Sequence, residues 1–422
     1  MATDTEIAAK PLVVKEMALS GETALLAHCA RLRLSPRRVQ AIKDILGAGV
    51  DWGSLMNTAT WHRLTSLVSH HLRSPELASL VPAPMMAKLA SVHYQSLARN
   101  MLLQDELGRL VAAFNKQGIP VVLLKGSALL DVVYGDISLR PMSDLDLLVR
   151  PEDIARAESL ALSLDYAYLT KQGRGAVSEG NRHLPNLGHR KKGIFIELHQ
   201  HIVSTGDPCY FDIGEFWKRA RPVRKGNAEA LVFAPEDMLA HLAIKFLSDR
   251  RYQSNAAVGQ LCDISETIKH YGDSLDWDSV VRVSGENGFV AGMHSVLYGC
   301  QRVLGTPVPA KVMQRLCPAQ FDPDIADLFL RRRVLDTRPW LAHDLVGHQA
   351  PYSRRRALGA VIGRFTRLLG KMFGRNGHQG KRGLLSLGRV KVVMPRVFQA
   401  VLQPSKLKED LLLDRWLHDL YR

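Results

Sequence analysis

Three acidic residues near the middle of the chain have the types and the spacing of a divalent-cation site. Asp144 and Asp146 flank Leu145 in the segment DLDLLV, where polar and apolar residues alternate as in a half-buried strand. Successive side chains of a strand point to opposite faces, so both carboxylates should project from one face. Glu197 lies in a second alternating segment, IELH, and would add a third carboxylate if the two strands are neighbours. Mg²⁺ prefers such oxygen ligands, and the bound ions can activate a hydroxyl group and hold a triphosphate for in-line attack.

A turn suited to phosphate precedes these acids. Gly126 and Ser127 lie where the β-branched segment PVVLL should run into a helix, ALLDVVYG. Glycine lets the backbone approach a phosphate closely, and the helix N-terminus offers unpaired N–H groups. We expect the Ser127 hydroxyl to donate to a β- or γ-phosphate, with Lys125 and Arg140 neutralising the same group.

The elements that must position these residues follow from the periodicity of the apolar residues. Residues 20–115 and the chain beyond about residue 235 have helical spacing, and Pro151 begins a further amphipathic helix. Strands are expected at 120–124, 144–149, 166–170 and 193–202. The sequence therefore predicts an α+β protein in which helical regions stand on both sides of a short run of strands.

The stretch from Leu123 to Leu169 resembles the uncharacterised nucleotidyltransferase family of the polymerase-β-like superfamily. That family pairs a Lys-Gly turn, here Lys125-Gly126, with Arg-Pro-Met-x-Asp-x-Asp-Leu-Leu-Val, here Arg140 to Val149. A later acid-Leu-His strand matches Glu197-Leu198-His199, and the resemblance covers roughly residues 90–305. It implies a small mixed β-sheet flanked by helices, magnesium dependence and transfer of a nucleotidyl group from a nucleoside triphosphate. It does not imply an acceptor.

The predicted function is thus a Mg²⁺- or Mn²⁺-dependent nucleotidyltransferase that moves an NMP from an NTP to an unidentified hydroxyl-bearing acceptor. The expected catalytic and metal-binding residues are Asp144, Asp146 and Glu197, with Glu197 acting as a ligand or as a general base. The expected nucleotide contacts are Lys125, Gly126, Ser127 and Arg140. A role in surface polysaccharide metabolism is one hypothesis for the acceptor.

Two other functions compete with this enzyme. The first is a non-catalytic nucleotide-binding sensor or scaffold, which would bind nucleotide without turning it over. The second is a nucleic-acid enzyme that adds terminal nucleotides, whose mark would be salt-sensitive RNA binding. The presence of all three acids favours the enzyme over the sensor.

Four regions are expected along the chain. A helical N-terminal region takes residues 1–94 and the nucleotidyltransferase α/β domain takes residues 95–225. A helical cap domain follows at 226–330, and a basic, partly amphipathic C-terminal region at 331–422.

Several other polar residues are candidates for the functional site, but each also has a purely structural explanation. Lys245 and Asp263 lie on predicted cap helices, where each could meet phosphate or simply face solvent. Two further Asp-x-Asp pairs, beginning at Asp276 and Asp322, are interpreted as helix caps or loop acids. Four histidines could suggest zinc, namely His183, His189, His199 and His201. The spacing of His199 and His201 is, however, common on polar strand surfaces, and His199 could instead orient a phosphate or acceptor.

Composition restricts the class of protein. With 422 residues, 46% hydrophobic and 23% charged, the chain should form two or three globular domains. Its five cysteines are scattered without a C-x-x-C pair, which argues against a disulfide framework or a structural zinc site. We find neither a signal-peptide pattern nor an apolar run long enough to span a bilayer. A cytoplasmic location is therefore expected.

The net charge of +15 is concentrated near the C-terminus. Residues 331–396 carry sixteen Lys and Arg against two acids, so the rest of the chain is near neutral. Within this segment, residues 354–375 place apolar and basic residues on different sides of a predicted helix. Peripheral contact with an anionic membrane at the inner face, or with a protein partner, is expected there. Nucleic acid is disfavoured because stacking aromatics are scarce.

Overall fold

The computed structural model describes residues 19–169, 180–205, 209–251 and 256–335, together with residues 409, 412, 413 and 416. The amphipathic segment 354–375 and most of the basic C-terminal region lie outside the described residues. Described residues up to Leu335 belong to one compact unit.

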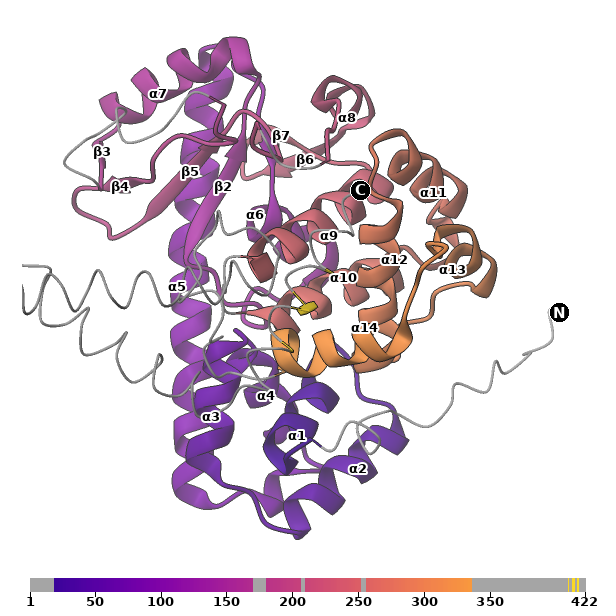
Figure 1. The fold of residues 1–422 in the computed structure, drawn as a ribbon. Coiled ribbons are helices and arrows are strands. Elements are labelled where there is room, and N and C mark those ends of the chain that lie inside the picture. The colour runs from indigo at the N-terminus through magenta and orange to yellow at the C-terminus, as the bar shows by residue number, and fades with distance from the viewer. Residues whose placement is uncertain are drawn as a thin grey trace, which may run out of the picture. The chain divides into compact units, whose positions relative to one another are not determined.

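A seven-stranded mixed sheet runs through this unit in the order β3-β4-β5-β2-β1-β7-β6 (Figure 1). Its strands are β1 (Val122–Leu123), β2 (Asp144–Leu148), β3 (Tyr166–Tyr168), β4 (Leu187–His189), β5 (Phe195–His199), β6 (Arg221–Lys225) and β7 (Ala228–Val232). β2 pairs parallel with β5, and β1 pairs parallel with β7. The remaining neighbours, β1–β2, β3–β4, β4–β5 and β6–β7, are antiparallel.

Helices precede and follow the strands. The N-terminal ones are α1 (Gly21–Cys29), α2 (Pro36–Gly47), α3 (Trp52–Trp61), α4 (Thr65–Leu72) and the 34-residue α5 (Ala83–Lys116). Between the strands lie α6 (Lys125–Leu129) with a π-helical turn η2 (Leu130–Tyr134), α7 (Ile154–Ser163) and α8 (Ile213–Arg219). The last group is α9 (Pro235–Arg251), α10 (Ala257–Tyr271), α11 (Trp277–Glu286), α12 (Val290–Gly299), η6 (Cys300–Leu304), α13 (Ala310–Leu316), α14 (Pro323–Phe329) and η7 (Leu330–Leu335). These elements confirm the predicted α+β fold class.

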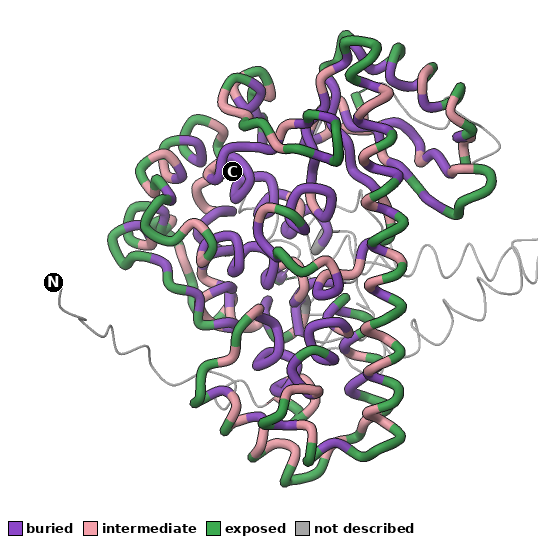
Figure 2. The backbone as a smooth tube through the Cα atoms, turned by 180° about the vertical axis from the view of Figure 1, so that it is seen from behind, coloured by how far each residue is buried: buried purple, intermediate pink, exposed green. Residues whose placement is uncertain are grey.

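The long helix α5 connects the N-terminal helices to the sheet. It packs on α4 at one end and on β2, β6, β7 and α7 at the other. Figure 2 shows that its outer side is exposed while its inner side is buried. The residues that alternate with the acids in β2 and β5, namely Leu145, Leu147, Ile196 and Leu198, are all 0% exposed. Their burial fixes the opposite faces of both strands, and with them the direction of the acidic side chains.

Two predicted domain boundaries cut through elements of this fold. The boundary at residue 94 falls inside α5, which continues without a break. The boundary at 225 falls in the β6–β7 hairpin, which the sequence interpretation missed; β7 belongs to the sheet as the parallel partner of β1. The hairpin turns at Gly226, whose φ of 58° is left-handed. A Gly-Asn pair between two β-prone segments is a signal that could have revealed it.

The two additional Asp-x-Asp pairs are helix caps, as predicted. The Asp276 carboxylate accepts hydrogen bonds from the backbone N–H groups of Asp278 and Ser279 at the start of α11. Asp322 accepts equivalent bonds at the start of α14. These carboxylates satisfy helix N-termini and need no ligand to explain them.

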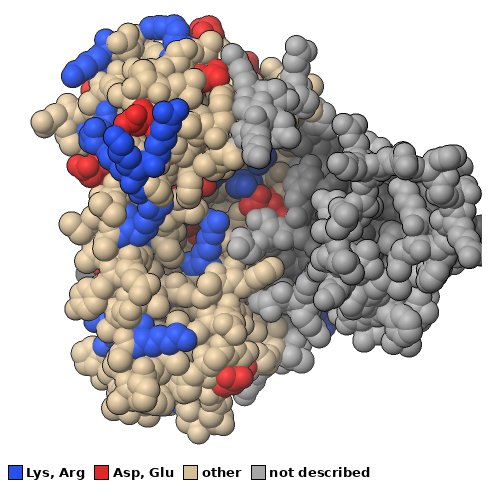
Figure 3. Space-filling view, turned by 90° about the vertical axis from the view of Figure 1, so that its left-hand side faces the viewer, with Lys and Arg blue, Asp and Glu red and all other residues tan. Residues whose placement is uncertain are grey.

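The charges of the described residues mark no binding surface on the face drawn in Figure 3, and the hydropathy of their helices marks no membrane span. Basic and acidic side chains are intermingled on the face drawn in Figure 3. Among the described residues, no helix combines the length and the apolar character that a membrane span requires.

Candidate active site

The parallel pairing of β2 and β5 brings the predicted acids together. Asp146 stands opposite Glu197 in the register, and Asp144 precedes Asp146 by two residues on the same face of β2. The expectation that these two strands are neighbours is therefore confirmed. Three carboxylates from two segments more than fifty residues apart line one cavity.

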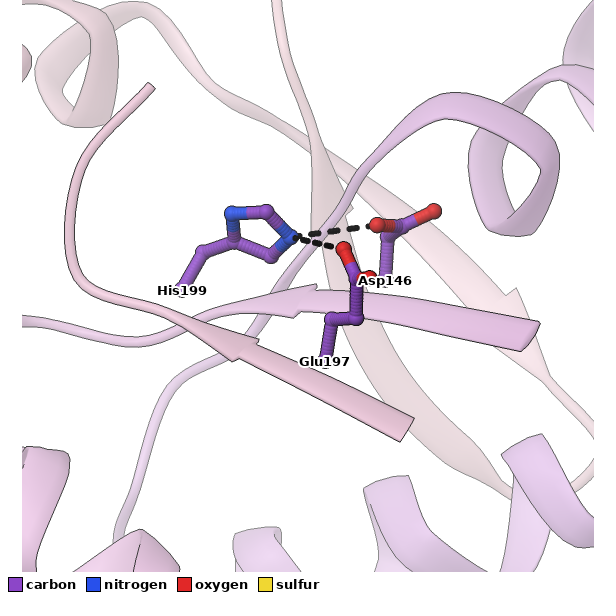
Figure 4. A group of neighbouring side chains, drawn as sticks. All are labelled: Asp146, Glu197 and His199. Carbon is purple, nitrogen blue, oxygen red and sulfur yellow. Dashed lines mark hydrogen bonds and ion pairs between the residues drawn. The ribbon is translucent and has the colours of Figure 1, made fainter. Parts of the chain in front are cut away.

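Two nitrogen-bearing side chains hold Asp146 and Glu197. The Lys125 Nζ lies 2.5 Å from Asp146 Oδ1 and 3.4 Å from Glu197 Oε2. The His199 Nε2 lies 3.1 Å from the same Asp146 oxygen and 3.3 Å from the same Glu197 oxygen (Figure 4). Each carboxylate thus shares one oxygen between an ammonium group and an imidazole.

These contacts separate the acidities of the three carboxyl groups. Burial opposes ionisation of Asp146, but Lys125 and His199 outweigh it and hold its pKa well below the usual value. Against the same burial, the hydrogen bond from His199 and the charge of Lys125 lower the pKa of Glu197 to about 2. Burial and the charges of Asp146 and Glu197 instead raise the pKa of Asp144. Negative charge therefore accumulates beside Asp144.

The residues present fit a divalent cation. Asp146, Glu197 and His199 each offer a ligand atom, and these atoms lie within 4.8 Å of one another. Carboxylate oxygens suit Mg²⁺ and Mn²⁺, and an added imidazole nitrogen is compatible with Mn²⁺ and other transition metals. The raised pKa of Asp144 reflects its burial and the negative charges of Asp146 and Glu197 beside it. A cation would offset those charges.

The turn before these acids differs from the expectation at Ser127. Its side chain is 0% exposed, and its Oγ accepts a hydrogen bond of 3.1 Å from the backbone N–H of Asp146. The Ser127 side chain does not line the cavity, so it is not placed to donate to a phosphate there. It ties the turn to β2 because the buried N–H of Asp146 needs an acceptor.

Lys125 and Gly126 do line the cavity. Lys125 is the first residue of α6 and has a φ of 48°, a left-handed value that is uncommon outside glycine. Gly126 is required for a different reason: a Cβ built there would lie 2.4 Å from Nη1 of Arg140 and 2.9 Å from Sδ of Met142. The turn is therefore closely covered by the loop that precedes β2.

Arg140 is fixed by α10 instead of standing free for phosphate. Its Nε and Nη2 donate to the two oxygens of Asp263, each at 2.8 Å. The Tyr134 hydroxyl donates to the same carboxylate at 2.7 Å. Burial opposes the charge of Arg140, but Asp263 outweighs it and raises the Arg140 pKa above its usual value. This bidentate pair joins the loop before β2 to the helical cap.

A cavity of about 240 Å³ opens over this constellation. The charged or polar residues that line it are Arg63, Lys125, Tyr134, Arg140, Ser143, Asp144, Asp146, Arg182, His183, Glu197, Lys245, Asp249, Gln260 and Asp263. Lys245 and Asp263 were candidates from sequence, and Lys245 is paired with Asp249 at 2.6 Å. Sequence reasoning missed Arg63, Arg182, Asp249 and Gln260, because each lies in a loop or helix where a charged or amide side chain usually faces solvent.

The four candidate histidines do not converge on one point. The His183 ring lies 5.1 Å from that of His199, with Nδ1 of His183 donating to the Leu184 carbonyl. His189 instead packs edge-on against Tyr166, and His201 lies near Tyr210. In the part of the chain that the structure describes, only His199 joins a cluster that could hold a metal. A four-histidine zinc site is not formed.

Comparison with known proteins agrees with this geometry. No curated protein gives a significant match to the chain. A family model described as uncharacterised nucleotidyltransferase matches residues 48–305, from the loop before α3 to the end of η6. The match contains all three carboxylates, Lys125 and the cap helices α9 and α10. Because it spans more than half of the 422 residues, the chain belongs to the uncharacterised nucleotidyltransferase family.

Proposed function

We propose that this protein is a nucleotidyltransferase that depends on Mg²⁺ or Mn²⁺ and transfers an NMP from an NTP to an acceptor hydroxyl. One observation supports this most strongly: Asp144, Asp146 and Glu197 line the same cavity as a turn carrying Lys125 and Gly126. Family membership supports nucleotidyl transfer in general. The metal, the nucleotide and the acceptor belong to the proposal.

The reaction is an in-line substitution at the α-phosphorus. The acceptor oxygen forms a bond to phosphorus, the bond to the β-phosphate oxygen breaks, and pyrophosphate leaves with the electron pair. A divalent ion would supply positive charge to the phosphates and lower the pKa of the acceptor hydroxyl. The hydroxyl proton passes to a carboxylate of the cluster, and Asp144 is assigned this role because it lines the cavity and, unlike Asp146 and Glu197, forms no ion pair with Lys125 or His199.

The chain's own side chains divide the remaining work. Asp146 and Glu197 are assigned as metal ligands, because Lys125 and His199 favour their ionised forms. Asp146, Glu197 and His199 would hold the metal, and Lys125, which lines the same cavity, would supply positive charge to the phosphates. Arg140 keeps the loop over Gly126 closed through its pair with Asp263.

Release of pyrophosphate tests the proposal. The four common NTPs are incubated with Mg²⁺ or Mn²⁺ and panels of sugars, nucleosides and protein acceptors. We expect metal-dependent release from the native protein and loss of release in the double variant Asp144→Asn plus Asp146→Asn. The matched control changes another Asp-x-Asp pair, Asp276→Asn plus Asp278→Asn, in which Asp276 caps a helix outside the cavity.

A nucleotide-binding module without catalysis is the second candidate. It is favoured by the ion pairs of Lys125, whose single charge offsets part of the negative charge of Asp146 and Glu197 without any metal. Such a module would bind NTP in the native protein and release no pyrophosphate with any acceptor. Equal pyrophosphate release by the native protein and the Asp144/Asp146 variant would contradict the enzyme at this site.

A further inference from the structure

The cavity is lined by two cationic side chains that have no acidic partner among the described residues. Three of its five lysines and arginines are ion-paired at the cavity wall: Lys125 with Asp146 at 2.5 Å, Arg140 with Asp263 at 2.8 Å and Lys245 with Asp249 at 2.6 Å. The other two, Arg63 and Arg182, form no ion pair with any residue that the structure describes. We propose that Arg63 and Arg182 form an anion site of this cavity that binds a phosphate or carboxylate group of a substrate. Its assignment to a substrate rests on the proposed function.

The backbone holds Arg63 in an unusual conformation. Its φ of 56° is left-handed, and the N–H groups of Arg63 and Leu64 bond to the carbonyls of Thr60 and Ala59 at 3.1 and 2.8 Å. Residues forced into this region cluster at binding and catalytic sites. The conformation turns an exposed arginine of the α3–α4 loop toward the cavity.

Close contact with α10 fixes this loop. The Ala256 N–H donates to the Trp61 carbonyl at 2.8 Å, and Ala256 is itself left-handed with a φ of 71°. A Cβ on Gly259 would lie 2.3 Å from the His62 carbonyl oxygen, so only glycine permits this approach. The N-terminal helices thereby contribute a side chain to a cavity formed mainly by the sheet and the cap.

The backbone of Arg182 is held by the segment that follows β5. Its carbonyl accepts hydrogen bonds from the N–H groups of Gln200 and His201 at 2.9 and 3.1 Å, just after β5. Its Nη1 lies 3.5 Å from the Ser248 hydroxyl on α9, which leaves the other donors of the guanidinium available. A half-buried guanidinium with unused donors suits a phosphate or carboxylate.

The pKa of one lysine agrees with positive charge gathered around Lys125, Arg182 and Lys245. The pKa of Lys245 is lowered by burial and by the charges of Lys125 and Arg182, even though Asp249 is its partner. A bound anion would relieve this repulsion. The anion has two sources with the same chemistry, the phosphate tail of the nucleotide or an acidic group on the acceptor.

Binding measurements on the full chain test the site. Inorganic phosphate, tripolyphosphate and ATP are titrated calorimetrically into the native protein and into Arg63→Gln, Arg182→Gln and the double variant. We expect each single change to weaken tripolyphosphate binding about tenfold, the loss of one charge-assisted contact. Arg63→Lys should recover part of the affinity, and Arg33→Gln, an exposed arginine outside the cavity, should bind as the native protein does.

The two sources give different patterns. A nucleotide source predicts that the variants also weaken ATP about tenfold. An acceptor source predicts unchanged ATP affinity but loss of phosphate binding to protein saturated with a non-hydrolysable ATP analogue. Native-like binding of all three anions by the double variant, or no anion binding by the native protein, overturns the site. Arginine-dependent anion binding without any pyrophosphate release would retain the site and reject the proposed function.

Discussion

The Nε2 atom of His199 lies 3.1 Å from Asp146 and 3.3 Å from Glu197, so one imidazole connects the carboxylates of two adjacent parallel strands. The ring is 2% exposed, and its Nδ1 has no hydrogen-bond partner among the described residues. Its contacts are therefore directed into the carboxylate cluster. This places His199 in the position of a residue that orients, or joins, the metal ligands that we propose.

Replacing His199 should weaken metal binding. In His199→Asn, Asp146 and Glu197 lose the donor that holds their oxygens together, and we expect Mn²⁺ affinity to fall about 10- to 100-fold. Calorimetric titration of Mn²⁺ into the metal-free protein measures it. The control is His189→Asn on β4, whose ring packs on Tyr166 away from the acids. Unchanged Mn²⁺ affinity in a folded His199 variant would show that the imidazole supports the sheet only.

Removing Lys125 should strengthen the stabilisation of the protein by Mn²⁺, whereas removing His199 should weaken Mn²⁺ binding. In Lys125→Met without metal, Asp146 and Glu197 lose their ammonium partner, and we expect a loss of about 3 kcal/mol in stability. Mn²⁺ should then stabilise the variant more than the native protein, because the ammonium no longer competes for the same oxygens. Thermal unfolding with and without saturating Mn²⁺ measures this difference.

The comparison for Lys125 is Lys218→Met, which breaks an exposed ion pair with Glu215 on α8. Such pairs contribute about 1 kcal/mol or less, and this one is remote from the acids. Equal Mn²⁺-induced stabilisation of the native protein and the Lys125 variant would mean that lysine and metal do not share a site.

Sequence periodicity predicted the carboxylate cluster because it fixes the face of each strand. Leu145 and Leu147 must be buried, so Asp144 and Asp146 face the other way whatever the rest of the fold does. The prediction also required that β2 and β5 be neighbours in the sheet. The alternating pattern around Glu197 indicated a second half-buried strand, and the structure pairs it with β2. The local sequence pattern thus predicts which side chains of a strand share a face.

Contacts that depend on loops were not readable in the same way. Arg63 reaches the cavity through a left-handed turn and through close packing of the His62 carbonyl on Gly259, nearly two hundred residues away. Arg140 was expected near phosphate, but Asp263 of a distant helix binds it. The local sequence pattern identifies neither the cavity contact of Arg63 nor the Asp263 partner of Arg140. Both depend on packing between distant segments, and many other charged residues have the same local pattern.

Ser127 illustrates how one residue type serves two roles. A hydroxyl at a strand-to-helix turn suggests phosphate, yet its Oγ accepts from the Asp146 N–H at 3.1 Å. We expect Ser127→Ala to lower stability by about 1 to 3 kcal/mol, because a buried N–H loses its acceptor. Metal affinity should fall with it as Asp146 shifts, while affinity for metal-free ATP stays unchanged. Denaturant titration and ATP binding measure the two effects, and a selective loss of ATP affinity would restore the phosphate role.

The Arg140–Asp263 pair should be a main link between the sheet and the cap. Asp263→Ala leaves a buried guanidinium without its carboxylate, and we expect a loss of about 3 to 5 kcal/mol in the free energy of unfolding. Tyr134→Phe, which removes one hydrogen bond to the same carboxylate, should cost about 1 kcal/mol. Urea denaturation measures both.

An exposed pair on α11 provides the contrast. Arg282 and Glu286 lie 3.1 Å apart with both side chains at least half exposed. Glu286→Ala should change stability by less than about 1 kcal/mol. Similar losses for Asp263→Ala and Glu286→Ala would contradict the view that burial makes the first pair important.

Acid should destabilise the N-terminal helices through two buried histidines. Burial and nearby arginines lower the pKa of His28 to about 4, and burial lowers that of His71 to about 4 despite its bond to the Arg31 carbonyl. In the unfolded chain these histidines bind protons near pH 6.5, whereas in the folded protein they bind them only near pH 4. Stability is therefore full above pH 6.5 and falls as the pH drops toward 4.

Each of these histidines should account for about 2 kcal/mol of the stability lost between pH 7.5 and pH 5. We expect His28→Gln and His71→Gln to flatten the pH dependence by that amount each, whatever they do to stability at pH 7.5. Urea denaturation at the two pH values measures the slope, with the exposed His70→Gln as control. A slope as steep in both variants as in the native protein would mean that these rings are protonated, or reach solvent, in the folded state.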